Sequence, residues 1–302
     1  MANIHMPPLK LPWVREEGWL PGPLPTSAEI EAATTEFPSI FDSRSRRTVL
    51  VNDLFVVKYG AVVFENEGHA LLLLENMEVP TSRLYAMYRE GEKLFIIMEF
   101  IPGVPLSDIW PTLSEEEKEP IVAQLRRAFD CVRALRSPKT FSAVCGGPLP
   151  HRFFFFFSYQ KKDPLISGPF DDEKDISRAL ALKSRANWEE WGRQPWTSDF
   201  FSRHLATVFS GHESVFTHGD LQRKNILVLE QGDLSSGSGK SYLVTAIVDW
   251  ESAGWYPSYW EYALCFTYFD WSDDWAEKIE RILKPYVKEA ALMRFVGQDL
   301  DA

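Results

Sequence analysis

The chain has 302 residues, which is enough for one large domain or for two lobes that each bury a core. Hydrophobic residues make up 45% of the chain and aromatic residues 14%, which excludes a disordered protein. Acidic residues outnumber basic residues by 43 to 32, and the formal net charge of −11 argues against nucleic acid as a partner.

Neither a secreted protein nor a membrane protein is expected. The three cysteines, Cys131, Cys145 and Cys265, are widely spaced and give no disulfide framework or zinc pattern. The N-terminus lacks a basic stretch followed by an apolar run, and the densest apolar run, residues 153–157, is too short to span a bilayer. We therefore expect a soluble, cytoplasmic protein with no obligate protein partner evident.

The first hundred residues predict an arm followed by a small sheet. Residues 1–25 are rich in proline and predict an extended arm that lies over the fold. Thr26 and Glu29 have capping-box spacing, so a first helix is expected to begin there. Beyond them, β-type runs surround one helical stretch: strands at 49–51 and 54–58, a helix at 64–75, and strands at 84–88 and 94–98.

The rest of the chain is predicted to be mainly helical. Ser114 and Glu117 form a second capping box at the start of an amphipathic helix that Pro138 is expected to end. Further helices are expected near residues 171–191 and from residue 259 onward. Between them, a hairpin of residues 226–229 and 242–248 surrounds a low-complexity loop, 232–239, that is predicted to be mobile.

The strongest chemical pattern lies at residues 217–228, with sequence THGDLQRKNILV. Phosphoryl transfer from ATP needs a carboxylate near the acceptor hydroxyl and oxygen ligands for magnesium in one pocket. Asp220 and Asn225, five residues apart, supply a carboxylate and one metal ligand, and Asp249 follows the apolar run 246–248 as a second carboxylate. His-Gly-Asp alone is more typical of a structural turn, so the register of Asp220, Asn225 and Asp249 carries the hypothesis.

This segment resembles the catalytic loop of the aminoglycoside phosphotransferase family, the small-molecule branch of the protein-kinase-like fold. Residues 247–262, IVDWESAGWYPSYWEY, are similar to fungal members, and the blocks VVKYG at 56–60 and IMEFIPG at 97–103 also match. The resemblance implies an α+β, two-lobed fold: an N-terminal antiparallel sheet lobe over residues 26–101, with the hinge at its end, and a larger, mainly helical C-terminal lobe over 102–302.

The same resemblance implies an ATP site between the lobes. Lys58 corresponds to the strand lysine that grips the α- and β-phosphates of the donor. Its helix partner is expected to be Glu67, with Glu65 as the rival, although Glu67 also fits an ordinary helix-surface carboxylate. The Glu99 carbonyl and the Ile101 amide are expected to bind the adenine edge.

The implied activity is ATP- and magnesium-dependent transfer of the γ-phosphoryl group to a hydroxyl of a small molecule. In this scheme Asp220 orients the acceptor hydroxyl, and Asn225 and Asp249 hold magnesium. The acceptor stays open among aminoglycosides, choline-like amines, sugars and secondary metabolites.

Two departures bear on the function: one leaves an alternative open and the other disfavours a protein kinase. The turn expected to cover the phosphates, residues 42–48, contains no glycine, although its arginines could compensate by charge. This favours a non-catalytic, pseudokinase-like binding module as the alternative, and the scaffold could also serve other natural-product chemistry. Asp249-Trp250-Glu251 replaces the Asp-Phe-Gly of protein kinases, and no activation segment follows, so a protein kinase is disfavoured. Glu251 could also touch magnesium.

Several prominent residues are expected to be structural. His218 is interpreted as a buried residue bonded to the backbone, and Trp250, Trp255 and Trp260 as packing residues. Residues 153–157 are expected to pack against the C-terminal helices rather than line a substrate pocket. A solvated helix face is preferred over a cation-attracting surface for one acidic group: Asp270, Asp273, Asp274, Glu277 and Glu280.

Overall fold

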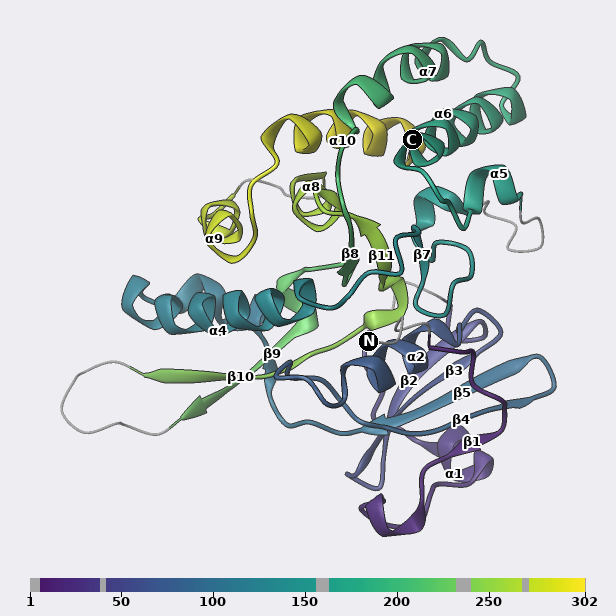
Figure 1. The fold of residues 1–302 in the computed structure, drawn as a ribbon. Helices are drawn as coiled ribbons and strands as arrows, with labels where there is room; N and C mark the ends of the chain where they lie inside the picture. The colour runs from purple at the N-terminus through teal and green to yellow at the C-terminus, as the bar shows by residue number, and fades with distance from the viewer. Residues whose placement is uncertain (1–5, 39–41, 156–162, 232–239, 268–271, 302) are drawn as a thin grey trace.

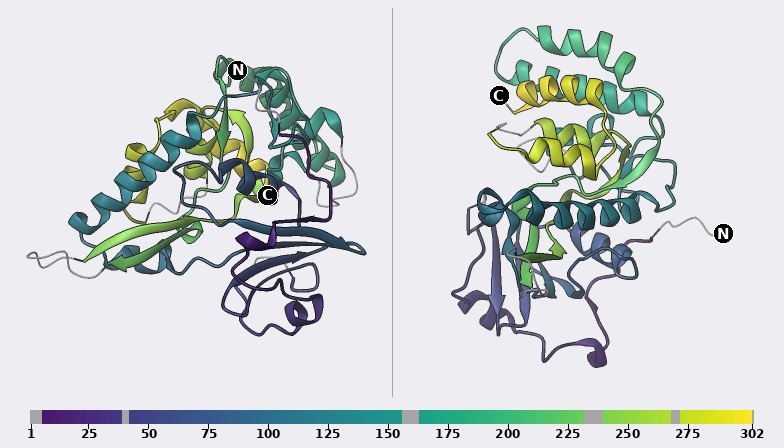
Figure 2. Two further views of the ribbon diagram at one scale, coloured as in Figure 1. Left: turned by 60° about the horizontal axis from the view of Figure 1, so that its bottom comes forward. Right: turned by 90° about the vertical axis from the view of Figure 1, so that its left-hand side faces the viewer.

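The computed structural model describes residues 6–38, 42–155, 163–231, 240–267 and 272–301. Figure 1 shows a sheet lobe built from the first part of the chain and a mainly helical lobe built from the rest. In Figures 1 and 2, helices α6, α7 and α10 lie at the end of the helical lobe farthest from the sheet. None of the helices within the described ranges combines the length and the apolar character needed to cross a membrane.

Strand alternation decides which side chains of the sheet lobe face the second lobe. The antiparallel sheet has the order β1-β4-β5-β3-β2. Val57 and Tyr59 belong to a hydrophobic core between the sheet and α1, so Lys58 between them points to the opposite face, where α2 lies. The elements of this lobe are β1 (Trp13–Val14), α1 (Ser27–Ala32), β2 (Arg46–Val51), β3 (Phe55–Gly60), α2 (Asn66–Leu74), β4 (Leu84–Glu90) and β5 (Lys93–Glu99).

The proline-rich arm joins the sheet as an edge strand. Trp13 and Val14 pair with Met87 and Ala86 of β4, so the arm extends the sheet by one short strand. Arg15 then forms an ion pair with Glu75 at 2.7 Å, just beyond the end of α2. These contacts fix the arm along the sheet edge that lies next to α2.

The helices of the second lobe are α3 (Leu106–Ile109), α4 (Glu115–Arg133), α5 (Pro164–Ser167), α6 (Glu173–Glu190), α7 (Trp196–Val208), α8 (Trp260–Thr267), α9 (Trp275–Ile282) and α10 (Val287–Leu300). The predicted capping boxes are present at both Thr26 and Ser114. Helix α4 ends before Pro138, contrary to the prediction, because its last turn tightens at Ala134, whose amide donates to several preceding carbonyls.

Two small sheets hold a pair of loops side by side. In one, strand order is β10-β9-β6, and in the other it is β7-β11-β8. Residues 218–225 connect β8 to β9, while residues 248–253 connect β10 to β11. Because β8 pairs with β11 and β9 pairs with β10, each loop is anchored beside the other at both ends. The strands are β6 (Val104–Pro105), β7 (Ser142–Ala143), β8 (Ser214–Thr217), β9 (Ile226–Gln231), β10 (Ser241–Ile247) and β11 (Gly254–Pro257). The predicted mobile stretch 232–239 lies outside the described residues.

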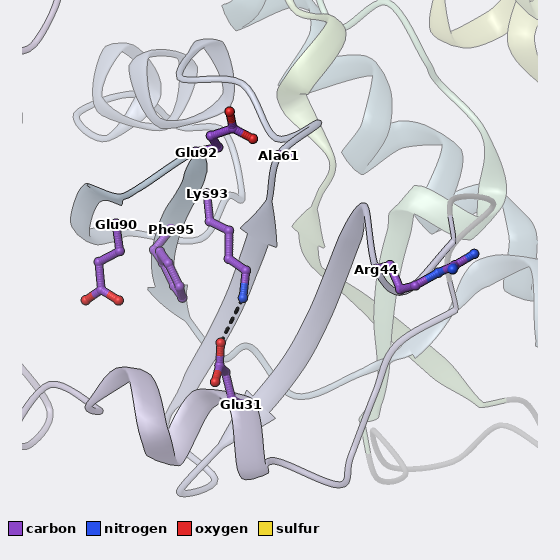
Figure 3. A pocket seen from close by; sticks show the side chains of 7 residues that line it. All are labelled: Glu31, Arg44, Ala61, Glu90, Glu92, Lys93 and Phe95. Atoms are coloured by element: carbon purple, nitrogen blue, oxygen red, sulfur yellow. Dashed lines mark hydrogen bonds and ion pairs between the residues drawn. The ribbon is translucent and has the colours of Figure 1, made fainter.

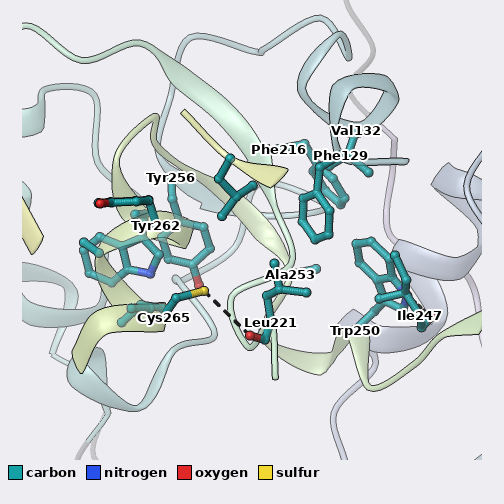
Figure 4. Close-up of a cluster of buried hydrophobic side chains, with 14 of the residues drawn as sticks. Phe129, Val132, Phe216, Leu221, Ile247, Trp250, Ala253, Tyr256, Tyr262 and Cys265 are labelled. Atoms are coloured by element: carbon teal, nitrogen blue, oxygen red, sulfur yellow. Dashed lines mark hydrogen bonds between the residues drawn. The ribbon is translucent and has the colours of Figure 1, made fainter. Parts of the chain in front are cut away.

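A core of aromatic and aliphatic side chains supports both loops (Figure 4). Leu221 of the first loop and Trp250 of the second belong to the same buried cluster as Phe129 and Val132 of α4. Trp255 and Trp260 are also buried, which confirms the packing role predicted for these tryptophans together with Trp250. Phe153 and Phe154 are buried as expected, while residues 156–157 of that run lie outside the described part of the chain.

Candidate active site

Lys58 of β3 lies between two carboxylates that come from different parts of the chain. Its Nζ is 2.6 Å from Glu67 Oε2 on α2 and 2.6 Å from Asp249 Oδ1, which follows β10. Lys58 and Glu67 are almost completely buried. The structure therefore brings together the predicted strand lysine, its first-choice helix partner and the predicted metal-binding aspartate.

Glu65, the rival partner for Lys58, belongs to a different ion pair. Its Oε1 accepts from Arg89 at 2.9 Å on the surface of the sheet lobe. Helix α2 begins at Asn66, and a helix residue reaches the same face again only after three or four positions. Glu65 and Glu67 therefore point in different directions, and the structure selects Glu67.

Arg46, at the start of β2, adds a second cation to this cluster. One guanidinium nitrogen lies 2.7 and 2.9 Å from the two carboxylate oxygens of Glu251, and another lies 3.5 Å from Asp249 Oδ1. The arrangement sets two cations, Arg46 and Lys58, against the three carboxylates of Glu67, Asp249 and Glu251. The cluster thus carries an excess of negative charge.

These neighbours determine the protonation of the buried groups. Burial raises the pKa of Asp249, but the Lys58 ammonium and then Arg46 outweigh it and hold that pKa at about 2. Burial lowers the pKa of Lys58, but the opposite charges of Asp249 and Glu67 outweigh it and raise that pKa above its ordinary value. For Glu67 burial dominates and raises the pKa despite the attraction of Lys58. At neutral pH Asp249 is therefore an anion and Lys58 a cation.

The loop of residues 218–225 holds Asp220 through side-chain amides. Asn225 Nδ2 donates to Asp220 Oδ2 and to the Asp220 carbonyl, both at 2.9 Å, and Gln222 Nε2 donates to Asp220 Oδ1. The Asp220 side chain is 28% exposed, so the oriented carboxylate is accessible from the surface. The amide donors fix the direction of the carboxylate, which suits a group that accepts a hydrogen bond from a hydroxyl.

His218 connects the two loops, as the structural interpretation predicted. Its Nδ1 accepts from the Asp220 amide at 3.1 Å, so in the neutral ring Nε2 carries the proton and donates to the Val248 carbonyl at 2.9 Å. The Val248 amide in turn donates to the Asn225 carbonyl at 2.9 Å. These bonds join the residue before Asp249 to both ends of the other loop.

Gly219 permits the close approach of the two loops. Its φ of +83° lies in the left-handed region, and a Cβ atom there would come within 2.7 Å of the Ser252 carbonyl oxygen. The Glu261 carboxylate of α8 accepts hydrogen bonds from the backbone amides of His218 and Gly219, at 2.7 and 3.2 Å. Glu261 lies within residues 247–262, the stretch that resembles the family, but no local pattern indicates this role.

Asn66 attaches α2 to the second loop, and sequence reasoning missed it. Its Nδ2 donates to the carbonyls of Glu251 and Ala253 at 2.9 and 2.8 Å, and its Oδ1 accepts from the Val144 amide at 3.2 Å. Asn66 precedes Glu67 directly, so these bonds set the position from which Glu67 reaches Lys58. Only the spatial neighbours reveal this role, because they lie 78 to 187 residues away in sequence.

Oxygen ligands for a hard cation converge beside Lys58. Carboxylate oxygens of Glu67, Asp249 and Glu251 all lie within 4.8 Å of one another, a donor set that suits magnesium. Asn225, the other predicted ligand, directs its Nδ2 to Asp220, so its Oδ1 is the atom that would serve a cation. The residues present therefore fit a magnesium site at Asp249.

The predicted adenine-binding residues lie where the chain passes from one lobe to the other. Glu99 is the last residue of β5, and Ile101 follows it before β6. The Glu99 amide donates to the Arg83 carbonyl at 2.9 Å, and its side chain accepts from the Arg83 amide at 3.2 Å. Both residues are half-buried.

An open hollow lies elsewhere on the sheet lobe (Figure 3). It has a volume of about 450 Å³ and is lined by Glu31, Arg44, Ala61, Glu90, Glu92, Lys93 and Phe95. None of the predicted site residues lines this hollow, and its Lys93 is paired with Glu31 at 2.8 Å. The hollow is therefore distinct from the Lys58 cluster.

The acidic group near α9 is largely occupied by internal contacts. Asp273 pairs with Arg223, Asp274 with Lys118, and Glu280 accepts from the Tyr262 hydroxyl. Asp270 lies outside the described residues. These contacts favour the structural interpretation over a cation-attracting surface.

The model of the phosphotransferase enzyme family, APH, matches residues 41–292. Comparison with curated proteins gives no match.

Solved structures share the fold at low sequence identity. They include a thermostable mutant of aminoglycoside phosphotransferase APH(4)-Ia in its apo form, at 15% identity, TM-score 0.52, and coverage of 90% of this chain and 96% of that chain. The streptomycin–ATP complex of APH(2")-IIa gives 12% identity, TM-score 0.56 and coverage of 89% and 87%. Aminoglycoside-3'-phosphotransferase of type VIII gives 13%, 0.53, 90% and 98%. These likenesses confirm the predicted kinase-like fold.

The Asn66 contacts predict a specific loss of stability. Asn66→Ala should lower the free energy of unfolding by about 2–4 kcal/mol, because two carbonyls and one amide lose their partner. Urea unfolding measures this change. Asn76→Ala, which removes an exposed asparagine just beyond the same helix, should stay within about 0.5 kcal/mol of the wild type. Equal stability of the two variants would contradict the role assigned to Asn66.

Proposed function

The chain belongs to the phosphotransferase enzyme family, and from this premise we propose that it is a small-molecule kinase that uses ATP and magnesium. The reaction transfers the γ-phosphoryl group of ATP to a hydroxyl group of a small molecule. The observation that carries the proposal is the Lys58 ammonium, 2.6 Å from both Glu67 and Asp249, in a protein whose neighbouring loop holds Asp220 by amide donors.

Side chains of the Lys58 cluster and backbone groups between the lobes both bind the donor nucleotide. Lys58 grips the α- and β-phosphates, and Glu67 fixes the direction of its side chain. The Glu99 carbonyl and the Ile101 amide bind the adenine edge at the passage between the lobes. Backbone groups suffice for this contact, which is why it places little demand on side-chain identity.

Asp249 and Asn225 hold magnesium, which when bound neutralises charge on the transferred phosphoryl group. Asp249 is suited to this because its pKa of about 2 keeps it ionised. Its neighbour Val248 is bonded to both His218 and Asn225, so the two ligands are held in a fixed relation. Glu251, also near this point, supports the same cation.

Asp220 receives the acceptor. Its carboxylate, oriented by Gln222 and Asn225, accepts a hydrogen bond from the acceptor hydroxyl and takes the proton late in the reaction. A loose transition state needs positioning more than a strong base, so a carboxylate held in this direction is adequate.

The acceptor is proposed to be a soluble, hydroxyl-bearing small molecule. Aminoglycosides, the substrate class named for the solved structures with this fold, choline-like amines, sugars and secondary metabolites all meet this description. We place the reaction in the cytoplasm, without nucleic acid, a membrane or an obligate protein partner. A screen of ATP consumption against pooled hydroxyl compounds would identify the acceptor.

One feature favours a second candidate function, a pseudokinase-like binding module. The turn of residues 42–48 has no glycine, so its backbone has less freedom to approach phosphate. The ion pairs of Lys58 with Glu67 and Asp249 support catalysis instead, because a module that no longer handles nucleotide has no need of them.

Nucleotide binding should separate the two functions. ATP with magnesium at about one hundred times its dissociation constant should raise the melting temperature by about 5 °C, because it binds only the folded state. ATP with EDTA should give a smaller shift, since the carboxylates then lack their cation. Differential scanning fluorimetry measures both values. The absence of any shift at millimolar ATP and magnesium would favour the pseudokinase-like module.

The two aspartates should fail in different ways. Asp249→Asn should weaken magnesium-ATP binding and lower turnover, because a hard cation loses a negative ligand. Asp220→Asn should leave magnesium-ATP binding nearly unchanged and lower turnover by about 10²- to 10⁴-fold. Calorimetric titration gives the affinities, and a turnover assay with the identified acceptor gives the rates.

Asp171→Asn, which changes an exposed carboxylate before α6, is the matched control and should behave as wild type. An equal loss of nucleotide affinity in Asp220→Asn and Asp249→Asn would contradict the division of roles. Full activity of Asp220→Asn would contradict the proposed mechanism itself.

A further inference from the structure

The register of the sheet places Arg46 on the same face as Lys58. Thr48 of β2 pairs with Lys58 of β3, and Arg46 lies two residues from Thr48 on the same strand. Side chains two residues apart, and those directly opposite across a ladder, share one face. Arg46 and Lys58 therefore form a pair of cations on the side of the sheet that faces the second lobe.

The neighbouring arginines of the same turn serve other contacts. Arg47, on the opposite face, donates to the Tyr59 hydroxyl at 2.9 Å and to Glu36 at 3.1 Å. Arg44 is exposed and bonds to Asp42 within the turn at 2.7 Å. Among the contacts described for these three arginines, only those of Arg46 reach the Lys58 cluster.

Gly60 brings the glycine-free turn close to β3. The turn is closed by bonds from the amides of Ser45 and Arg46 to the Asp42 carbonyl, at 2.8 and 3.0 Å. Gly60 has a φ of +145°, and a Cβ atom there would lie only 2.1 Å from the Ser45 carbonyl oxygen. Gly60 on the facing strand thus permits this close approach. The approach places Arg46, at the start of β2, next to the Lys58 cluster.

The Arg46 guanidinium bonds to the Glu251 carboxylate, a partner that a phosphate group of the nucleotide could replace. Arg46 is 7% exposed, and its guanidinium engages both carboxylate oxygens of Glu251. A guanidinium fork fits phosphate oxygens as well as it fits a carboxylate. Carboxylates outnumber cations in this cluster. A bound divalent cation would therefore give Glu251 a positive partner in place of Arg46.

We propose that Arg46 is a phosphate-binding residue for the donor nucleotide, held by Glu251 until metal and nucleotide bind. This inference rests on the proposed function. On binding, Glu251 turns to the cation and the Arg46 guanidinium turns to the β- or γ-phosphate. A charged side chain then performs at this turn what backbone amides perform in a glycine-rich loop.

Calorimetric titration of magnesium-ATP and magnesium-AMP into the full chain tests the proposal. Arg46→Gln should weaken magnesium-ATP binding by about tenfold to a hundredfold, the value of a charge-assisted hydrogen bond. Binding of magnesium-AMP, which lacks the β- and γ-phosphates, should change much less. Arg46→Lys should retain part of the affinity, and Arg44→Gln, in the same turn, should equal the wild type.

A magnesium-ATP affinity of Arg46→Gln that equals or exceeds that of the wild type overturns the proposal. If Arg46 only neutralises the carboxylates, Arg46→Gln frees Asp249 and Glu251, and magnesium-ATP then binds equally or more tightly. Wild-type protein that binds no magnesium-ATP contradicts the proposed function. Wild-type binding that Arg46→Gln leaves unchanged contradicts only the role of Arg46.

A second variant decides the question if Arg46→Gln does not fold. Glu251→Gln removes the charge that holds Arg46, so metal-free ATP, measured in EDTA, should bind several-fold more tightly than to wild type. An unchanged or weaker affinity for metal-free ATP in Glu251→Gln would overturn the idea that Glu251 holds Arg46 in reserve.

Discussion

The buried ammonium of Lys58 is the constraint on which the site depends. A buried charge is costly unless opposite charges accompany it, and Lys58 finds both partners outside its own strand. Glu67 comes from α2 and Asp249 comes from the second lobe, so satisfying one side chain requires the sheet, the helix and the other lobe to meet. Asn66 supports the same junction by bonding α2 to the carbonyls around Glu251.

The second requirement is that two loops of the helical lobe keep a fixed relation. Strand pairing anchors residues 218–225 and 248–253 at both ends, and His218 joins them in the middle. Gly219 then permits contact between their backbones. As a result, Asp220 and Asn225 on one loop and Asp249 on the other form a single unit, which the Lys58 cluster attaches to the sheet lobe.

Sequence reasoning could predict what local patterns encode. The β-type runs placed Lys58 at the end of a strand, capping boxes gave the starts of two helices, and the spacing of Asp220 and Asn225 indicated one loop. It favoured Glu67 over Glu65 as the helix partner of Lys58 without settling the choice, because that choice depends on how α2 packs against the other lobe. Asn66, Glu261 and Arg46 gave no signal of their specific contacts, since their partners are distant in sequence. The strands β7, β8 and β11 were missed because two to four residues carry little periodicity.

A crystal structure with magnesium and a non-hydrolysable ATP analogue tests the central claim most directly. The account predicts the analogue between the lobes, with its phosphates at Lys58, magnesium at Asp249 and Asn225, and the terminal phosphate directed toward Asp220. Density for the analogue in the hollow beside Glu31 and Lys93, or between the lobes without contact to Lys58 and Asp249, would contradict it.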